Sequence, residues 1–131
     1  MLTRLDNIDI TCRDFDAMVA FYHEVLELPF LQPYDRASGW AGLRIGSVAL
    51  YLLADERAAR LSGPAGLPWV RGLGFEVDDL DRAIAWLDAK AVRWEGGVVV
   101  SPWYRYRGLF DPDGNVLYLS LPDKAALGGA R

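Results

Sequence analysis

The sequence predicts an α+β fold built from two similar halves. An alternating stretch, an acidic pair and a stretch with helical spacing follow one another in residues 7–22 and again in residues 72–87. A Leu-Tyr-Leu triplet then occurs at 50–52 in the first half and at 117–119 in the second. Self-similarity at this scale indicates a repeated supersecondary unit, here a strand, a helix and further strands.

The first half begins with a strand and a helix. Residues 4–12 alternate, with Ile8 and Ile10 on an apolar face, as in a strand with one buried side. Asp14 precedes the helical stretch and Asp16 lies in its first turn, where carboxylates bind free backbone N–H groups. The apolar residues spaced by three and four predict one buried helical stripe. They are Phe15, Met18, Val19, Tyr22, Val25 and Leu26.

Short strands complete the first half after Pro29 ends the helical pattern. We expect them at about 30–35, 39–45 and 48–53, with a tight hairpin turn at Gly46-Ser47. Residues 54–69 are polar, small and rich in turn formers, which is typical of a connector.

The second half repeats this order. We expect a strand at 70–77, a helix from Asp79 to about 89, and a strong turn at 111–115. Further strands are expected near 92–94, 97–101, 103–110 and 115–121. Trp86 occupies the position of Phe21 under the repeat, which predicts a core side chain.

The chain of 131 residues is predicted to form one domain. Module 1 covers about 4–53, the linker 54–69, module 2 about 70–121 and the tail 122–131. Each module has the order β-α-β-β-β, so its single helix covers one face of its sheet. We expect the two modules to pair into a cup-shaped mixed sheet, with helices outside and the uncovered faces inside.

Composition excludes several classes of function. The chain is 52% hydrophobic and 24% charged, as in ordinary soluble proteins. It has no stretch of about 20 apolar residues and no signal peptide, so we expect no membrane partner. Its single cysteine, Cys12, predicts a small core residue in a reducing cytoplasm. A net charge of −4 argues against nucleic-acid binding.

Several motifs make the chain resemble the vicinal oxygen chelate superfamily of glyoxalase I, bleomycin-resistance proteins, fosfomycin-resistance enzymes and extradiol dioxygenases. The resemblance covers about 4–121 and implies paired βαβββ modules and commonly a homodimer. The motifs are Asp-Phe-Asp at 14–16, Phe-Tyr at 21–22, Val-Leu-Glu-Leu at 25–28, Gly-Phe-Glu-Val-Asp-Asp-Leu-Asp at 74–81 and Phe-Asp-Pro-Asp-Gly-Asn at 110–115.

The resemblance also identifies the positions that bind a metal in the family's enzymes. Four side chains, usually His, Glu or Gln, chelate a divalent ion there, and the matching positions here are Asn7, Tyr51, Gly72 and Tyr118. Glycine offers no ligand, and phenols with a pKa near 10 are poor ligands at neutral pH. We therefore expect no metal and no cofactor. The single histidine, His23, is expected to be a solvated residue of the first helix.

The strand patterns predict an aromatic interior. Tyr51 and Tyr118 alternate with leucines that face the helices, and Trp40 and Arg44 alternate with Leu43. Strand 103–110 has two possible phases. The favoured phase turns Tyr104, Tyr106 and Phe110 inward. The other phase turns Trp103, Arg105 and Arg107 inward. The predicted ligand-binding residues are Asn7, Asp9, Trp40, Arg44, Tyr51, Glu76, Tyr104, Tyr106 and Tyr118. The alternative reading is that these rings only pack the interior.

Three functions are compatible with this pattern. The first is a metal-free protein that sequesters an aromatic or cationic compound, as bleomycin-resistance proteins do, with a role in antibiotic resistance. The second is a lyase, isomerase or dioxygenase-like enzyme that uses carboxylate and tyrosine acid–base chemistry, or an unusual metal site at Asp9 and Glu76. The third is a structural or regulatory dimer whose pocket has lost its function.

Overall fold

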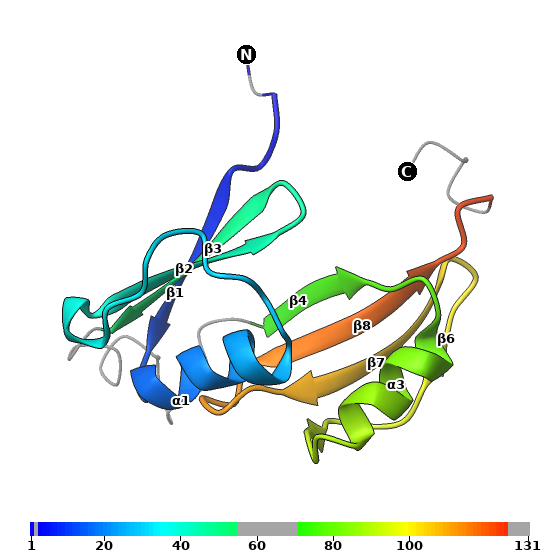
Figure 1. Ribbon diagram of the computed structural model, residues 1–131. Coiled ribbons are helices and arrows are strands. Elements are labelled where there is room, and N and C mark those ends of the chain that lie inside the picture. Colours follow the sequence, from blue (N-terminus) through cyan, green and yellow to red (C-terminus); the bar gives the residue numbers. More distant parts are fainter. Residues whose placement is uncertain (2, 55–70, 126–131) are drawn as a thin grey trace. The chain divides into compact units, whose positions relative to one another are not determined.

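A computed structural model describes residues 1, 3–54 and 71–125 of the chain (Figure 1). The described residues form helices and two mixed β-sheets, which confirms the predicted α+β class. The chain divides into two compact units, Met1–Trp69 and Val70–Arg131. Apart from residue 54, the expected linker lies outside the described residues, as does the tail from residue 126. The single domain and the cup between its modules stay predictions.

In its described residues, the first unit has a three-stranded sheet, the helix α1 and two short helical turns (Figure 1). In the strand order β1-β3-β2, β3 lies parallel to β1 and antiparallel to β2. Gly46 has a φ of 55° in the predicted turn between β2 and β3. The elements are β1 (Asn7–Cys12), α1 (Phe15–Ala20), the π-helical turn η1 (Phe21–Val25), the 3₁₀ turn η2 (Arg36–Ser38), β2 (Trp40–Ile45) and β3 (Val48–Ala54).

The second unit has the same connectivity in a five-stranded sheet. Here β8 lies parallel to β4 and antiparallel to β7, and β5 and β6 both pair with β7. The predicted repeat is therefore present in the strand pairing. The elements are β4 (Arg71–Glu76), α3 (Leu80–Asp88), β5 (Arg93–Trp94), β6 (Val99–Val100), β7 (Tyr104–Phe110) and β8 (Val116–Pro122).

The strand register shows which positions of the two units are equivalent. Asp9 of β1 is paired with Tyr51, and Gly74 of β4 is paired with Tyr118. Asp9 therefore corresponds to Gly74. Glu76 lies two residues further along β4, so Asp9 and Glu76 are not equivalent under the repeat.

Both helices begin at the aspartates that the sequence predicts. The side chain of Asp14 accepts a hydrogen bond from the N–H of Ala17 at 3.1 Å. The side chain of Asp79 accepts one from the N–H of Arg82 at 3.0 Å. Each carboxylate thus satisfies a backbone donor that lacks a partner within its helix.

One face of each sheet is buried. In the first unit, leucines of β2 and β3 share this face with Ile10 and Cys12 of β1. In the second unit, Leu109, Leu117 and Leu119 are buried in the same way. The helical side chains with at most 1% exposure are Met18, Tyr22, Leu80 and Leu87. The buried site predicted for Cys12 is confirmed, at 1% exposure.

Two predicted features of the fold are wrong. Residues 30–35 form no strand but a single bridge between Phe30 and Leu43, because Pro29 and Pro33 lack the N–H donors that a ladder needs. Trp86 is not a core residue, since it is 39% exposed and carries the ammonium of Lys90 over its ring. Helical periodicity places residue 86 beside the buried stripe rather than within it.

The described part of the chain contains no helix long and apolar enough to cross a membrane.

The turn between β7 and β8 is held by a buried carboxylate. Asp111 is 1% exposed and accepts hydrogen bonds from the N–H groups of Asp113 and Asn115, at 3.0 and 2.9 Å. It also accepts one from the side-chain amide of Asn115 at 2.8 Å. The turn sets the register between the two longest strands of the second unit.

We predict that Asp111→Ala lowers the free energy of unfolding by about 2–4 kcal/mol, because it leaves buried donors without an acceptor. Urea unfolding followed by circular dichroism would measure this loss. Asp78→Ala removes an exposed carboxylate of the same unit and should change stability by less than about 0.5 kcal/mol. Equal effects of the two substitutions would show that Asp111 does not hold the turn.

Candidate functional site

The candidate site lies on one face of the sheet in the second unit. Residues that are directly paired between strands share a face. Tyr106 is paired with Ser120, which is in turn paired with Glu76 of β4. Tyr104 and Tyr118 belong to the same face by alternation, whereas Leu109 lies on the buried face. The favoured phase of strand 103–110 is therefore confirmed.

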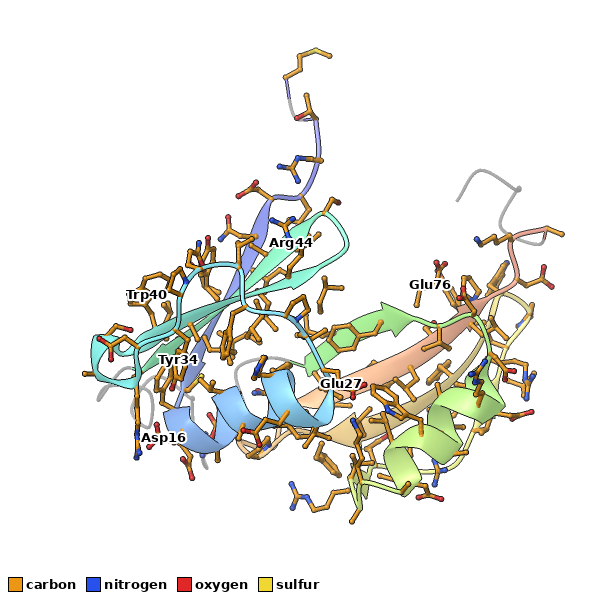
Figure 2. All side chains as sticks on the ribbon, in the orientation of Figure 1. Asp16, Glu27, Tyr34, Trp40, Arg44 and Glu76 are labelled. Carbon is orange, nitrogen blue, oxygen red and sulfur yellow. The ribbon has the colours of Figure 1, made fainter. Side chains whose placement is uncertain are left out.

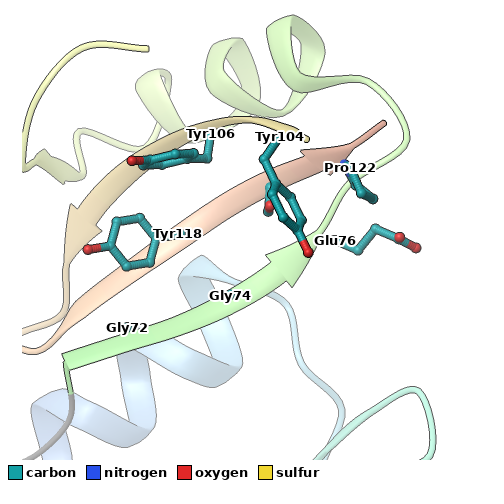
Figure 3. A pocket seen from close by; sticks show the side chains of 8 residues that line it. Gly72, Gly74, Glu76, Tyr104, Tyr106, Tyr118 and Pro122 are labelled. Carbon is teal, nitrogen blue, oxygen red and sulfur yellow. The ribbon is translucent and has the colours of Figure 1, made fainter. Parts of the chain in front are cut away.

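This face contains a pocket of about 460 Å³. In Figure 3 the rings of Tyr104, Tyr106 and Tyr118 stand over β7 and β8, and Glu76 projects from the end of β4. The hydroxyl groups of Tyr106 and Tyr118 point in the same direction. The lining residues are Gly72, Gly74, Glu76, Tyr104, Tyr106, Tyr118, Ser120 and Pro122.

Glycines lie on both strands beside Tyr118, and two of them, Gly72 and Gly74, line the pocket. The register places Gly74 and Gly108 on the two strands beside Tyr118. A β-carbon on Gly108 would lie 3.3 Å from Tyr118 Cε1. A β-carbon on Gly72 would lie 3.3 Å from Tyr118 Cε2, and the φ of Gly72, 109°, suits glycine best. The phenol ring thus lies against bare backbone, with Tyr106 edge-on at a centroid distance of 5.5 Å.

Three polar groups of the pocket have no hydrogen bond or ion pair within the described residues. Neither the carboxylate of Glu76 nor the hydroxyls of Tyr106 and Tyr118 form a hydrogen bond or ion pair there. Glu76 is exposed, and the two tyrosines are half-buried. The pocket therefore offers aromatic surface, one carboxylate and free hydroxyls to a ligand.

The other predicted site residues share one face of the first unit's sheet. Asp9 and Tyr51 are direct partners, and Trp40 and Arg44 both project from β2 (Figure 2). Asn7 donates a hydrogen bond to the carboxylate of Asp9 at 3.0 Å. The rings of Trp40 and Tyr51 are 6.4 Å apart between centroids, tilted by 55°. The predicted residues thus form one group in each unit.

Some residues of these two faces were missed by the sequence reasoning. Ser120 and Pro122 continue the alternation that begins at Tyr118, so the period of the strand could have identified them. Gln32 carries no such signal because it lies in the irregular segment before β2. Its side-chain amide donates to the hydroxyl of Tyr51 at 3.2 Å, while its Oε1 is buried without a partner among the described residues.

The residues at the expected metal positions do not fit a divalent ion. Asn7 is hydrogen-bonded to Asp9, and Tyr51 to Gln32. Within the described residues, no group of three or more His, Cys, Asp or Glu side chains is arranged to hold a metal. We therefore derive no chemistry through a metal ion at these positions.

A second hollow, of about 280 Å³, lies beside α1 and η1 in the first unit. His23, expected to be solvated, is half-buried, because its ring stacks on Phe30 at 3.9 Å and its Nδ1–H donates to the carbonyl of Leu28 at 2.9 Å. Tyr34 stacks on the other face of Phe30, near Asp16 (Figure 2). Burial and then Asp16 raise the pKa of Tyr34. Because these rings already stack on one another, the hollow is a weaker candidate than the tyrosine pocket.

Solved structures with the same fold include proteins with different functions. TnmS3, an antibiotic binding protein from Streptomyces sp. CB03234, is 25% identical, with a TM-score of 0.73 over 93% of this chain and 98% of that one. A glyoxalase family protein from Enterococcus faecalis is 28% identical, with a TM-score of 0.69 over 89% and 96%. A lactoylglutathione lyase from Agrobacterium tumefaciens, at 19% identity, has a TM-score of 0.72 over 92% and 95% and shares the fold.

A comparison with curated proteins gives no match. Residues 4–119, which make up most of the chain, nevertheless match the model of a protein family. The two mixed sheets, their repeated connectivity and this match agree. The chain belongs to the Glyoxalase/Bleomycin resistance protein/Dioxygenase superfamily.

Proposed function

We propose that this protein binds and sequesters an aromatic or cationic small molecule without using a metal. The observation that carries the proposal is the pocket of about 460 Å³ lined by Tyr104, Tyr106, Tyr118 and Glu76. Its size lies in the usual range of small-molecule sites, roughly 300–1,000 Å³. A concave site with aromatic walls and a few polar groups is also the usual form of such sites.

The chemistry of the lining favours flat or positively charged compounds. Tyrosine rings bind flat molecules by stacking and bind cations through their electron-rich faces. A cation–π contact contributes roughly 0.5–2 kcal/mol, depending on its exposure to water. Glu76 adds a negative charge at the end of β4. An anionic ligand would gain neither the cation–π contact nor the attraction to Glu76.

The similarity to TnmS3 supports a protective role. TnmS3 is an antibiotic binding protein, and the similarity extends over almost the full length of both chains. Sequestration of a toxic compound needs affinity but no catalytic group. A role in antibiotic resistance is accordingly part of the proposal.

The assembly and location of the protein are also proposals. We propose one domain with residues 54–69 as connector, and a homodimer as the resemblance to the superfamily implies. We further propose a cytoplasmic location, because a chain with a single cysteine, Cys12, cannot form an internal disulfide.

The enzyme alternative lacks a comparable observation. Acid–base chemistry would need a carboxylate and a tyrosine hydroxyl close to one substrate. Within the described residues, no hydrogen bond joins the carboxylate of Asp9 or Glu76 to a tyrosine hydroxyl. If these carboxylates are catalytic, replacing them with amides will abolish turnover.

We predict that Tyr118→Ala weakens binding of an aromatic probe by roughly 5- to 30-fold, because it removes the ring at the centre of the pocket. N-methylacridinium is a suitable probe, since it is flat and fluorescent and carries a positive charge. Its affinity can be measured by fluorescence titration.

The matched control for this prediction is Trp86→Ala. Trp86 is an exposed aromatic residue of the same unit, on α3 and outside the pocket. Its removal should leave the affinity unchanged. Equal losses for the two variants would place binding elsewhere on the protein.

Native mass spectrometry of untagged protein, purified without chelators, tests the metal-free assignment. We expect a dimer without stoichiometric metal, because Asn7, Tyr51, Gly72 and Tyr118 form a poor donor set. A retained organic molecule would identify the ligand class. One divalent ion per chain would contradict the assignment and favour the enzyme.

A further inference from the structure

Glu95 lies on the pocket face of the second unit, although the sequence pattern does not single it out. Its N–H donates to the carbonyl of Gly108 at 2.9 Å, which continues the pairing of β5 and β7 beyond Trp94. A β-carbon on Gly108 would lie 2.7 Å from Glu95 Oε2 and 3.3 Å from Tyr118 Cε1. The carboxylate therefore occupies the space that Gly108 leaves empty, beside the ring of Tyr118.

The first unit contains the same arrangement with a neutral side chain. Gln32 follows the bridge to β2 and lies over Gly42, which is paired with Tyr51. A β-carbon on Gly42 would collide with Gln32 Oε1 and lie 2.8 Å from Tyr51 Cε1. The amide of Gln32 donates to the hydroxyl of Tyr51 at 3.2 Å. In this unit Gln32 thus covers Gly42 and also hydrogen-bonds to Tyr51.

In the second unit, the corresponding groups are the carboxylate of Glu95 and the hydroxyl of Tyr118, and the described residues form no hydrogen bond between them. Glu95 is exposed, and among the described residues its carboxylate forms no ion pair and no hydrogen bond. The hydroxyl of Tyr118 is also unbonded within this part of the chain. Arg93 lies on the same face of the sheet as Glu95. Its guanidinium, however, lies 5.0 Å from the ring centroid of Phe110, which is two residues beyond Gly108 on β7.

We propose that Glu95 is the charge-selecting residue of the tyrosine pocket and that the natural ligand is a planar aromatic compound with a cationic nitrogen. The inference rests on the proposed binding function and adds the ligand's charge to it. A cation on the Tyr118 ring would gain attraction from the ring face and from the carboxylate at its edge. Glu76 provides a second carboxylate across the sheet, on β4. A neutral ring of the same shape would gain the stacking alone.

The test compares two probes of nearly equal shape on the intact protein. N-methylacridinium carries the positive charge, and 9-methylacridine is neutral in mildly alkaline buffer. Each is titrated by fluorescence into the wild type, Glu95→Gln and Glu24→Gln. Glu24 is an exposed glutamate of η1 that lines the weaker hollow of the first unit. Its amide makes the same change in net charge away from the tyrosine pocket, and it also detects any probe that binds in that hollow.

We expect the wild type to prefer the cationic probe, and Glu95→Gln to weaken that probe roughly three- to tenfold, as for a partly exposed charge pair. Affinity for 9-methylacridine should stay constant in all three proteins, and Glu24→Gln should match the wild type with both probes. The preference of the wild type should also decrease as salt is added, because ions screen exposed charges.

Other outcomes separate the two proposals. If both probes bind equally, or Glu95→Gln weakens both to the same extent, the charge selection by Glu95 is wrong, while the binding function stands. If neither probe binds the wild type, the binding function fails, and the inference about Glu95 fails with it. Near-ultraviolet circular dichroism of each variant shows whether the fold is retained.

Discussion

The alternation along the central strand of each sheet determines which side chains are buried and which are offered to a ligand. β3 lies between β1 and β2, and β8 lies between β4 and β7. Leu50 and Leu52 of β3 are buried, and so are Leu117 and Leu119 of β8. The tyrosine between each pair of leucines must then point to the opposite face, because successive side chains alternate. A shift of one residue would bury the phenols and expose the leucines.

The sequence predicted those parts of the fold that depend on local chemistry. Asp14 and Asp79 begin helices because a carboxylate just before the first turn binds free N–H groups. The phase of β7 followed from Leu109 alone, since one buried side chain determines the whole strand. Trp86 was misplaced because the repeat preserves the order of elements but not the depth at which each side chain is buried.

The candidate site was predictable in part for the same reason. Tyr104, Tyr106, Tyr118 and Glu76 lie on regular strands and could be assigned to a face by counting. Gln32 and Glu95 could not, because each lies at the irregular end of a short pairing, and its direction depends on a glycine in another strand. Such side chains become visible only when the strands are placed side by side.

Both units place a glycine beside the central tyrosine of the sheet, but they differ in how the space around that tyrosine is used. A glycine beside the central tyrosine weakens a strand, since it adds no side-chain packing and loses more conformational entropy on folding. In the first unit the space over Gly42 is filled by Gln32, which also bonds to Tyr51, so the space is used for packing. In the second unit Tyr118 has Gly74 on one side and Gly108 on the other.

Two glycines next to one tyrosine reduce packing on the face opposite the buried leucines. The space above Gly74 is left open as part of a pocket of about 460 Å³, whereas Glu95 lies over Gly108. A face that served only for stability would favour side chains that pack across the strands. The second unit instead maintains its register through the buried Asp111 turn at the end of β7, whose hydrogen bonds involve none of the tyrosines. This separation of stabilising and open regions is what a binding face requires, and it favours a functional pocket over one that only packs the interior.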